Sequence, residues 1–431
     1  MGHNSPLNLY GLQQMLTAIE QKTCTATDII EACFDRIEAR ESEVGAWQFR
    51  LSRSQYLDIY RGNQAFYEQS PLKGLPLGIK DVFDTADMPT EMGSAIHAGR
   101  QPIEDAACVT LIRQAGGIIL GKTVTTEFAY FTPGKTANPR DLTRTPGGSS
   151  SGSAAAVADG MVPAALGSQT AASVIRPAAY CGVNGYVGTR GEFSLRGGQP
   201  LAQSLDSLGL FARHAQDIEL LRAILLLRPL PDATLPARKP QRILLCPGEH
   251  IGATDAAMHD ALLEAARRFS AAGAEIILLE DGAFIKELVS QHFTIMAYEV
   301  CRNLASEIQH HDLLSSPFAS LAEEGRAISY DTYLAALAAA DAGRARLWPD
   351  AADYDAILAP AAPGVAPQGL AATGAPHMSR PWQAMALPVI NLPGINDSNG
   401  LPLGLQLIGR PHSDDRLLRM ARWAEDVLIQ A

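Results

Sequence analysis

The stretch from Thr145 to Ala179 constrains the fold of this chain more than any other feature, because it is rich in glycine, serine and alanine. It contains a Gly/Ser-rich segment, Gly147 to Ser153, and a second small-residue turn, Gly167 to Ser173. Such a segment is often a flexible linker, but this one is short and flanked by apolar residues. We therefore interpret it as a shaped loop inside a closely packed core.

The composition agrees with a large buried core. The chain has 431 residues, of which 47% are hydrophobic and 19% charged, whereas about 25% charged residues is typical of globular proteins. A chain of this length can bury a large core. The net charge of −11, with no long basic run, argues against nucleic acid or an anionic membrane as a partner.

The sequence contains no signal for a metal site, a disulfide framework or export. Its six cysteines lack Cys-x-x-Cys spacing, so we expect reduced, buried thiols. The N-terminal segment has no basic region followed by an apolar stretch, and no apolar run is long enough to span a membrane. We expect a cytoplasmic protein.

Strand-like and helix-like segments alternate along the chain, which predicts an α/β fold with helices covering a sheet. A strand–helix–strand unit over 241–279 favours parallel pairing. We find no linker that forces a domain boundary, and the best surface connection is 230–240. Helices are expected at 8–22, 25–40, 107–116, 154–158, 254–272, in most of 283–347 and at 414–428, and strands at 75–83, 117–121, 162–167, 241–246, 274–279, 355–358 and 403–408.

A lysine in an apolar strand is the candidate base. Lys80 lies in L-P-L-G-I-K-D-V-F, and no histidine stands near the serine loops. A free lysine has a pKa of about 10.4 and is a poor base at neutral pH, but burial disfavours its charged form. Two serine loops and one lysine suggest nucleophilic catalysis of the Ser-Lys type. Asp81 either orients a neighbour or is purely structural.

These segments resemble the amidase signature family of amide-bond hydrolases. Lys80 in G-I-K-D matches the lysine of that family. Ser149, the first serine of G-G-S-S, matches its bridging serine, and Ser173, which closes G-S-Q-T-A-A-S, matches its nucleophile. The separations between the three positions also fit the family, and the late segment 401–409 looks like its G-L-P-x-G-L-Q strand.

The resemblance implies one large α/β domain over 1–431, with a central mixed, mostly parallel sheet wrapped by helices. The signature core that carries the catalytic residues would be 74–213, and 241–350 would be a helix-rich variable part.

The resemblance also implies the roles of the site residues. Neutral Lys80 would accept a proton from Ser173 through Ser149, which follows a cis peptide bond, and Ser173 would attack the amide carbonyl. The acyl-enzyme would then be hydrolysed by water, with no metal and no organic cofactor. Small side chains let a carbonyl approach the backbone, so we expect an oxyanion hole from the N–H groups of Thr170, Ala171, Ala172 and Ser173.

Three positions depart from the family pattern. Gln169 stands where the family keeps an aspartate, and Ala171 and Ala172 stand where it keeps two glycines. The usual arginine position holds Ile175, and Arg176 follows one place later. We expect one ion pair fewer near the site and a narrower approach to the oxyanion hole, which puts substrate size and efficiency in question.

The segment 125–134 aligns with the family loop that lines the acyl pocket. Phe128, Tyr130 and Phe131 are therefore candidates for substrate contact, and Trp382, in a late segment, is a fourth. Each of the four fits a position in the core equally well.

The function implied is hydrolysis of a linear C–N amide bond of a small substrate, giving a carboxylate plus ammonia or an amine. A carbamoyl or ureido hydrolase of the allophanate or carboxybiuret type is an alternative, as is a glutaminase-type subunit of a tRNA-dependent amidotransferase, which needs partner subunits. A non-catalytic relative is a further alternative. The expected partner is a small amide, and a homodimer is compatible with the sequence, although no signal points to an interface.

Overall fold

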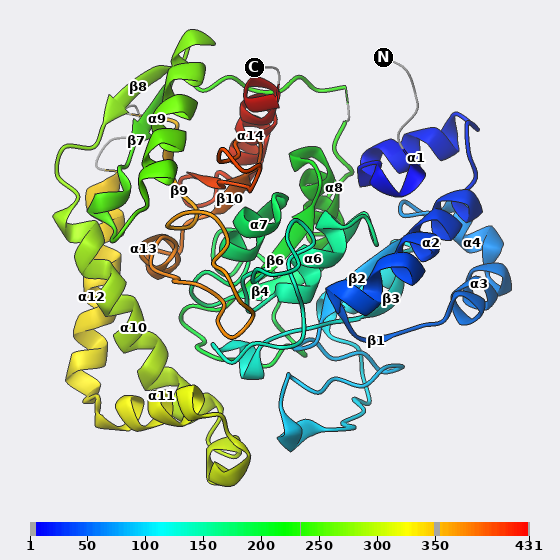
Figure 1. Cartoon of the computed structure of the whole chain (residues 1–431), viewed down its shortest axis with the longest axis horizontal. Coiled ribbons are helices and arrows are strands. Elements are labelled where there is room, and N and C mark those ends of the chain that lie inside the picture. Colours follow the sequence, from blue (N-terminus) through cyan, green and yellow to red (C-terminus); the bar gives the residue numbers. More distant parts are fainter. Residues whose placement is uncertain (1–5, 233, 349–353, 430–431) are drawn as a thin grey trace.

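The computed structural model describes residues 6–232, 234–348 and 354–429. Eleven strands form one sheet in the order β1-β3-β2-β4-β6-β5-β10-β11-β9-β7-β8, and helices cover it (Figure 1). The strands are β1 (Trp47–Arg50), β2 (Pro76–Lys80), β3 (Ile118–Thr123), β4 (Ala164–Gln169), β5 (Asn184–Val187), β6 (Ser207–Ala212), β7 (Arg242–Leu245), β8 (Glu275–Leu278), β9 (Ala356–Pro360), β10 (Val389–Leu392) and β11 (Leu405–Ile408).

The expected mixed sheet is confirmed, but its strands are not mostly parallel. Among the described strands, β2 pairs in parallel with β3 and β4, and β7 pairs in parallel with β8 and β9. The other six pairings are antiparallel. The expected strand–helix–strand units supply the parallel pairs, whereas short strands that alternation does not indicate, such as β5 and β10, supply antiparallel ones.

Fourteen α-helices of the described chain surround the sheet. The N-terminal helices α1–α4 lie at one end of the molecule, and α10–α12 form a long arm at the other end (Figure 1). The helices are α1 (Leu12–Glu20), α2 (Ala26–Val44), α3 (Arg53–Gly62), α4 (Gln64–Gln69), α5 (Ala107–Gln114), α6 (Ser151–Ala158), α7 (Ile175–Cys181), α8 (Ala215–Leu225), α9 (Ala256–Ala271), α10 (Ala283–Asn303), α11 (Ser316–Ala327), α12 (Tyr330–Leu347), α13 (Arg380–Ala384) and α14 (Asp414–Ile429).

Every helix and strand expected from the sequence is present, with ends that differ by a few residues. The connection expected at 230–240 is a loop in its described part, and Ala233 lies outside the described residues. No helix among the described residues has the length and apolarity that crossing a membrane requires.

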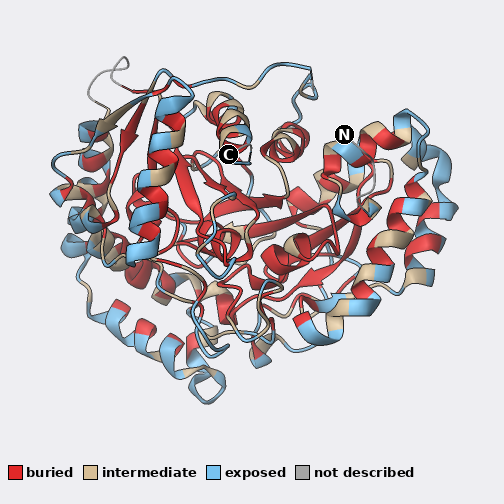
Figure 2. Cartoon of the chain, turned by 45° about the horizontal axis from the view of Figure 1, so that its top comes forward, coloured by how far each residue is buried: buried red, intermediate tan, exposed pale blue. Residues whose placement is uncertain are grey.

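The small-residue stretch lies at the centre of the core. Strands β2 and β4 and helix α6 are almost wholly buried, whereas the outer faces of the surrounding helices are exposed (Figure 2). The fit is tight: a Cβ added to Gly167 in β4 would lie 2.7 Å from Ser150 Oγ, and one added to Gly152 would lie 2.2 Å from the carbonyl oxygen of Ala46. Gly167 thus lets the two serine loops approach each other, and Gly152 lets the start of α6 pack against the backbone at Ala46.

Candidate active site

Lys80 is the last residue of β2 and is completely buried. Its Nζ lies 2.6 Å from Ser149 Oγ and 2.9 Å from Ser168 Oγ. Burial lowers the pKa of Lys80 well below its ordinary value, and the nearby carboxylate of Asp206 opposes this only in part. The lysine is thereby poised as a neutral amine, the form that can accept a proton.

The loop before α6 carries Ser149, and the peptide bond between Gly148 and Ser149 is cis. This loop and the turn after β4 are joined directly, because the N–H of Ser150 donates to the carbonyl of Ser173 at 3.2 Å. The Gly148 carbonyl accepts a hydrogen bond of 2.6 Å from the Arg176 guanidinium. The residues before and after Ser149 are therefore both fixed by hydrogen bonds to the segment 173–176.

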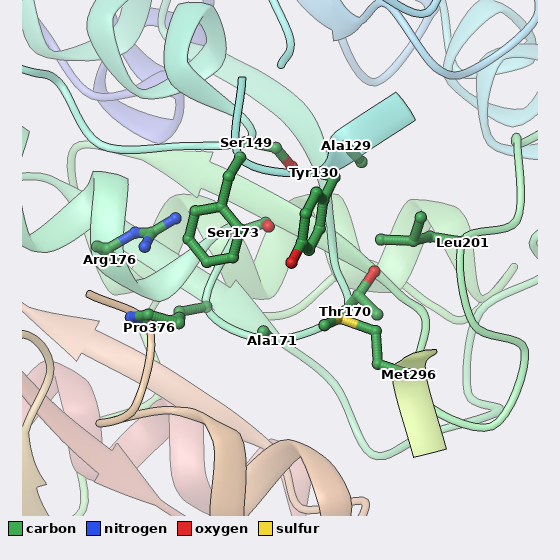
Figure 3. Close-up of a pocket in the computed structure, with 12 residues that line it drawn as sticks. Ala129, Tyr130, Ser149, Thr170, Ala171, Ser173, Arg176, Leu201, Met296 and Pro376 are labelled. Atoms are coloured by element: carbon green, nitrogen blue, oxygen red, sulfur yellow. The ribbon is translucent and has the colours of Figure 1, made fainter. Parts of the chain in front are cut away.

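Ser173 lies in the turn between β4 and α7, and its side chain faces the same cavity as Ser149 (Figure 3). Within the described chain, the backbone N–H groups of Ala171, Ala172 and Ser173 donate no hydrogen bond. Free N–H groups at the wall of a cavity are suited to bind a developing oxyanion. No hydrogen bond joins Ser149 to Ser173 in the described structure; such contacts in unliganded sites often tighten when substrate binds.

Gln169 fixes the end of this turn without an ion pair. Its Oε1 accepts hydrogen bonds from the N–H groups of Val174 and Ile175 at 2.9 and 3.1 Å. Its Nε2 donates to Gln383 Oε1 at 2.9 Å. A neutral pair of amides therefore occupies the position where the resembled family keeps an aspartate, as the departure at Gln169 led us to expect.

Thr170, the first residue of the turn after β4, is held by two groups that the sequence analysis did not single out. Its hydroxyl donates to Asp206 at 2.6 Å, and its carbonyl oxygen lies 2.7 Å from Nε2 of His292 in α10. Burial lowers the pKa of His292 to about 3, so the ring is neutral and Nε2–H is the donor. Nothing in the sequence links His292 to the turn, because the two meet only through tertiary packing.

The cavity at the two serines is very small, about 20 Å³, and is lined by Ser149, the turn 170–173, Tyr130, Phe131 and Arg176, with Leu201 and Met296 at its far side (Figure 3). A volume of about 10–15 Å³ holds one water molecule. By this measure the cavity holds about one water molecule, so an acyl group fits only if the aromatic wall moves.

The four aromatic candidates for substrate contact fall into two pairs. Tyr130 and Phe131 line the cavity. Phe128 and Trp382 do not: both are buried in the hydrophobic core, and Phe128 packs against Phe318 with ring centroids 5.3 Å apart. For Phe128 and Trp382 the structure thus favours the core interpretation over substrate contact.

Two larger hollows adjoin this small cavity. The first, about 460 Å³, lies between 131–133, the start of α11 and 371–376, and it shares Phe131 and Pro376 with the cavity. The second, about 380 Å³, is bounded largely by 195–207 and shares Ala129, Thr170 and Leu201 with the cavity. The small cavity at Ser149 and Ser173 is thus a constriction between two wider spaces.

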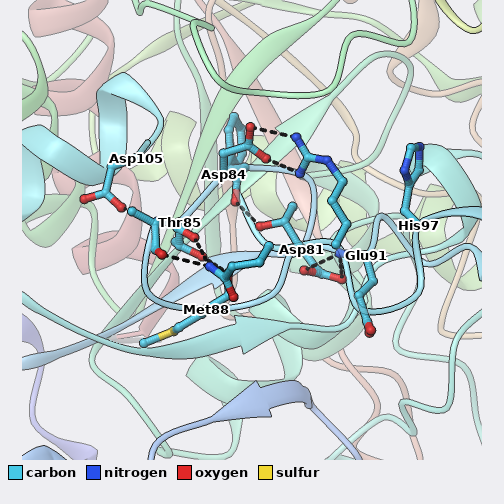
Figure 4. Close-up of polar contacts among 12 residues, drawn as sticks. Asp81, Asp84, Thr85, Met88, Glu91, His97 and Asp105 are labelled. Atoms are coloured by element: carbon cyan, nitrogen blue, oxygen red, sulfur yellow. Dashed lines mark hydrogen bonds and ion pairs between the residues drawn. The ribbon is translucent and has the colours of Figure 1, made fainter. Parts of the chain in front are cut away.

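Asp81 has a structural partner rather than a catalytic one. Its carboxylate accepts the N–H of Glu91 and lies 3.5 Å from Nζ of Lys122, a second buried lysine (Figure 4). Burial raises the pKa of Asp81 to about 6 and lowers that of Lys122 to about 8. Because Lys122 pairs with Ile79 across the strands, it projects to the opposite face of the sheet from Lys80.

Among the described residues, no group of three or more histidine, cysteine, aspartate or glutamate side chains is placed to hold a metal ion.

Comparison with known proteins reveals one family. The family model described as "Amidase" matches residues 28–418. A glutamyl-tRNA(Gln) amidotransferase subunit from Anaeromyxobacter sp. (strain K) is 31% identical, over 96% of this chain and 95% of that protein. The subunit of the same name from Legionella pneumophila (strain Paris) is 30% identical over 96% of each chain.

Solved structures agree over the whole fold. A crystal structure described as an amidase superimposes with a TM-score of 0.85 and 25% identity, covering 97% of this chain and 99% of that one. A structure from work on the evolutionary origins of an s-triazine catabolic enzyme gives a TM-score of 0.84 and 26% identity, covering 97% and 98%.

Proposed function

Since the chain belongs to the amidase family, we propose that it hydrolyses a linear C–N amide bond through an acyl-enzyme on Ser173, with Ser149 and Lys80 as the proton relay. The observation that carries this proposal is the contact between Lys80 Nζ and Ser149 Oγ at 2.6 Å, at the edge of a cavity that also contains Ser173. A buried neutral amine in that position is a competent base.

The reaction follows from these positions. Ser173 loses its proton to Lys80 by way of Ser149 while its oxygen attacks the substrate carbonyl. The oxyanion is stabilised by the free N–H groups of the turn that contains Ala171 and Ala172. The C–N bond breaks as the relay returns the proton to the leaving nitrogen, and water then releases the carboxylate product.

Ammonia release from a panel of primary carboxamides and carbamoyl compounds tests the proposal. We expect Ser173→Ala and Lys80→Ala each to lower kcat by at least ~10³-fold, because removal of a nucleophile or its base disables the relay. Lys286→Ala and Ser290→Ala, which alter exposed residues of α10, are the matched controls and should retain full activity.

A fluorophosphonate probe provides an independent readout of the nucleophile. It should label wild-type protein at Ser173 and leave the folded Ser173→Ala variant unlabelled. Undiminished turnover in Ser173→Ala, or labelling at another serine, would overturn the assignment.

A second candidate is a glutaminase-type subunit of an amidotransferase. It is supported by relatives of that name that align over nearly the full length of both proteins. Glutamine belongs in the substrate panel for this reason. Glutamine hydrolysis that appears only when a partner subunit from the same cell extract co-purifies with the chain would favour this candidate. Turnover of other amides by the isolated chain would favour an independent hydrolase.

A third reading, a carbamoyl or ureido hydrolase, uses the same relay and differs only in the acyl group. Such an enzyme would release ammonia from carbamoyl compounds in preference to carboxamides of equal size, so the same panel separates the two.

A further inference from the structure

Gln383, in helix α13, is connected to the nucleophile turn although 214 residues separate it from Gln169. Its side chain is 2% exposed and lines none of the hollows around Ser149 and Ser173. Gln383 therefore does not reach a substrate, and any effect on the reaction has to pass through other residues. Its role rests on the proposed function, because it concerns the nucleophile of that reaction.

Three hydrogen bonds form one continuous chain through two buried amides. The N–H of Val174 donates to Gln169 Oε1 at 2.9 Å. Gln169 Nε2 donates in turn to Gln383 Oε1, also at 2.9 Å. Gln383 Nε2 then donates to the carbonyl oxygen of Leu205 and, at 3.0 Å, to Ser207 Oγ. The chain thus begins directly after Ser173 and ends in the segment before β6.

Each amide of this chain has only one favourable orientation. Gln169 Oε1 faces the backbone N–H groups of Val174 and Ile175, and a reversed amide would place donors against donors there. Gln383 Nε2 faces the carbonyl of Leu205, so a reversed amide would place two acceptors together. Hydrogen bonds that all run in one direction polarise one another and strengthen the chain.

Each end of the chain lies in a peptide group next to a residue of the proposed reaction. The N–H of Val174 belongs to the peptide group that follows Ser173. The carbonyl of Leu205 belongs to the peptide group that precedes Asp206, whose carboxylate acts on Lys80. Gln383 therefore joins the backbone at the nucleophile to the backbone at the carboxylate that faces the base.

This connection begins where the sheet no longer provides one. The antiparallel ladder between β4 and β6 ends at the pair Gln169 and Ser207. Beyond that pair the two segments are joined by side chains, namely by Gln383 and by the hydroxyl of Thr170, which donates to Asp206 at 2.6 Å. Gln383 thus continues the contact between the two segments past the last ladder pair.

We propose that Gln383 is a positioning residue for the hydrolysis, which holds Ser173 in place relative to Asp206 through its hydrogen bonds to Gln169 and Leu205. Without the Gln383 amide, the buried carbonyl of Leu205 and the Gln169 amide each lose a partner, and a buried polar group without a partner is costly. The two segments would shift to recover partners, and Ser173 would move with them.

Gln383→Met tests the proposal, because methionine keeps the length and approximate volume of glutamine but cannot make these hydrogen bonds. We expect kcat for the best amide of the panel to fall by about 10- to 100-fold, since a displacement of 1 Å in an active site can cost about 100-fold. KM should change little, because no group that contacts the substrate is removed. The rate at which the fluorophosphonate labels Ser173 should fall by a similar factor. A kcat and a labelling rate equal to those of wild type would overturn the proposal.

Gln406→Met is the matched control. Gln406, in β11, is also fully buried, and its amide donates to the carbonyls of Pro360 and Met378 at 2.7 and 2.8 Å. Both substitutions should lower the Tm, but Gln406→Met should leave kcat and the labelling rate unchanged. Equal losses of kcat in the two variants would show that the loss of any buried amide is sufficient, and would overturn the proposal.

A double-mutant cycle tests whether Gln383 acts through Gln169. Gln169→Met breaks the same chain at its other member, so we expect Gln169→Met and Gln383→Met combined to lower kcat by no more than about 3-fold beyond the larger single loss. Losses that multiply would mean that the two residues act independently, which contradicts the proposed chain.

The outcomes distinguish this inference from the proposed function. If the proposed function fails, the wild type hydrolyses no amide and Ser173 is not labelled. If only the role of Gln383 fails, wild type and Gln383→Met hydrolyse amides and are labelled at equal rates. If Gln383→Met does not fold, Gln383→Asn takes its place with the same expectation, because its amide is one methylene too short to reach both Gln169 and Leu205.

Discussion

At the scale of single residues, the chemistry depends on keeping Lys80 uncharged in a site that also contains Asp206. Burial favours the neutral amine, and the Asp206 carboxylate favours the ammonium form. Because a lowered lysine pKa places the neutral form at lower pH, activity should be present above the pKa of Lys80 and lost below it.

Asp206→Asn should move the acid limb of kcat/KM to lower pH. The substitution removes the charge that raises the pKa of Lys80 but retains an oxygen that can accept the Thr170 hydroxyl. The measurement is a pH profile of the best amide substrate for wild type and variant. An unchanged limb, or a limb that moves to higher pH, would contradict the assignment of Lys80 as the titrating base.

His292 should act as a positioning residue for the oxyanion turn. Its Nε2–H donates to the carbonyl of Thr170, and the same peptide group carries the N–H of Ala171 that faces the cavity. His292→Phe should lower kcat by about 10-fold or more with little change in KM, because an oxyanion donor is misaligned. His292→Gln can restore a donor at the Nε2 position and should recover most of kcat. Equal losses in the two variants would point to packing alone.

Some residues of the candidate site can be predicted from the sequence, and others cannot. The prediction that Lys80, Ser149 and Ser173 lie together comes from the resemblance of three short motifs to the amidase signature family, each of which can be recognised locally. It does not reveal His292 or Asp206, since no local pattern joins them to Thr170 and only tertiary packing brings them there. Phe128 and Phe131 lie in the same loop, and the sequence does not distinguish them. Phe128 is nevertheless buried in the core and Phe131 lines the cavity, because the direction of a side chain in an irregular loop depends on the whole fold.

At the scale of elements, helix α14 is attached to the sheet through a buried acid. The Glu425 carboxylate accepts hydrogen bonds from the Asn184 side chain in β5 and from the N–H of Ala215 at the start of α8. Burial raises the pKa of Glu425 to about 8. Between its ordinary value and about 8 the folded state therefore binds more protons than the unfolded state, so stability falls as pH rises through this window.

Glu425→Gln should raise the Tm at pH 8, by roughly 2 °C or more, and the gain should shrink at pH 5. The amide imitates the protonated carboxyl and needs no proton at high pH. Thermal unfolding of wild type and variant at both pH values checks this. The control is Glu20→Gln, which alters an exposed acid of α1 and should show no pH-dependent gain. A gain at pH 5 as large as at pH 8 would exclude titration of Glu425 as the cause.

The elements that the sequence reveals share a physical property. The long periodic helices α2, α9 and α14 are recognisable because each carries an apolar face at helical spacing. Strands β5 and β10 are buried throughout and stand outside the strand–helix alternation that indicates strands such as β7 and β8, so their extended form depends on neighbours on both sides. The prediction of a mostly parallel sheet fails in part for the same reason, since three of the six antiparallel pairings involve β5 or β10.

At the scale of the whole molecule, the sheet consists of two groups of strands that are connected by two strands from the C-terminal part of the sequence. Strands β1 to β6 are contiguous in the sheet, whereas β7, β8 and β9 reach them only through β11 and β10. These two connecting strands come last in the chain.

Leu407→Pro, in the middle of β11, should uncouple the two groups. Proline removes a backbone donor and is poorly tolerated within a central strand. We expect calorimetry to show one transition for the wild type and two, or one broadened and lowered, for the variant. Leu278→Pro, in the edge strand β8 where the side chain is 57% exposed, is the matched control and should leave a single transition. A single, unbroadened transition for Leu407→Pro would contradict the coupling role of β11.

This order of strands has a consequence for the chain as it leaves the ribosome. The segment that contains the serine loops can close its part of the sheet while the remainder is still being made. The segment over β7 to β9 must wait, since its link to the rest is synthesised at the very end. During that interval the exposed edges of β5 and β9 are open to pairing with other chains. A nascent protein of this kind depends most on chaperones just before its synthesis is complete.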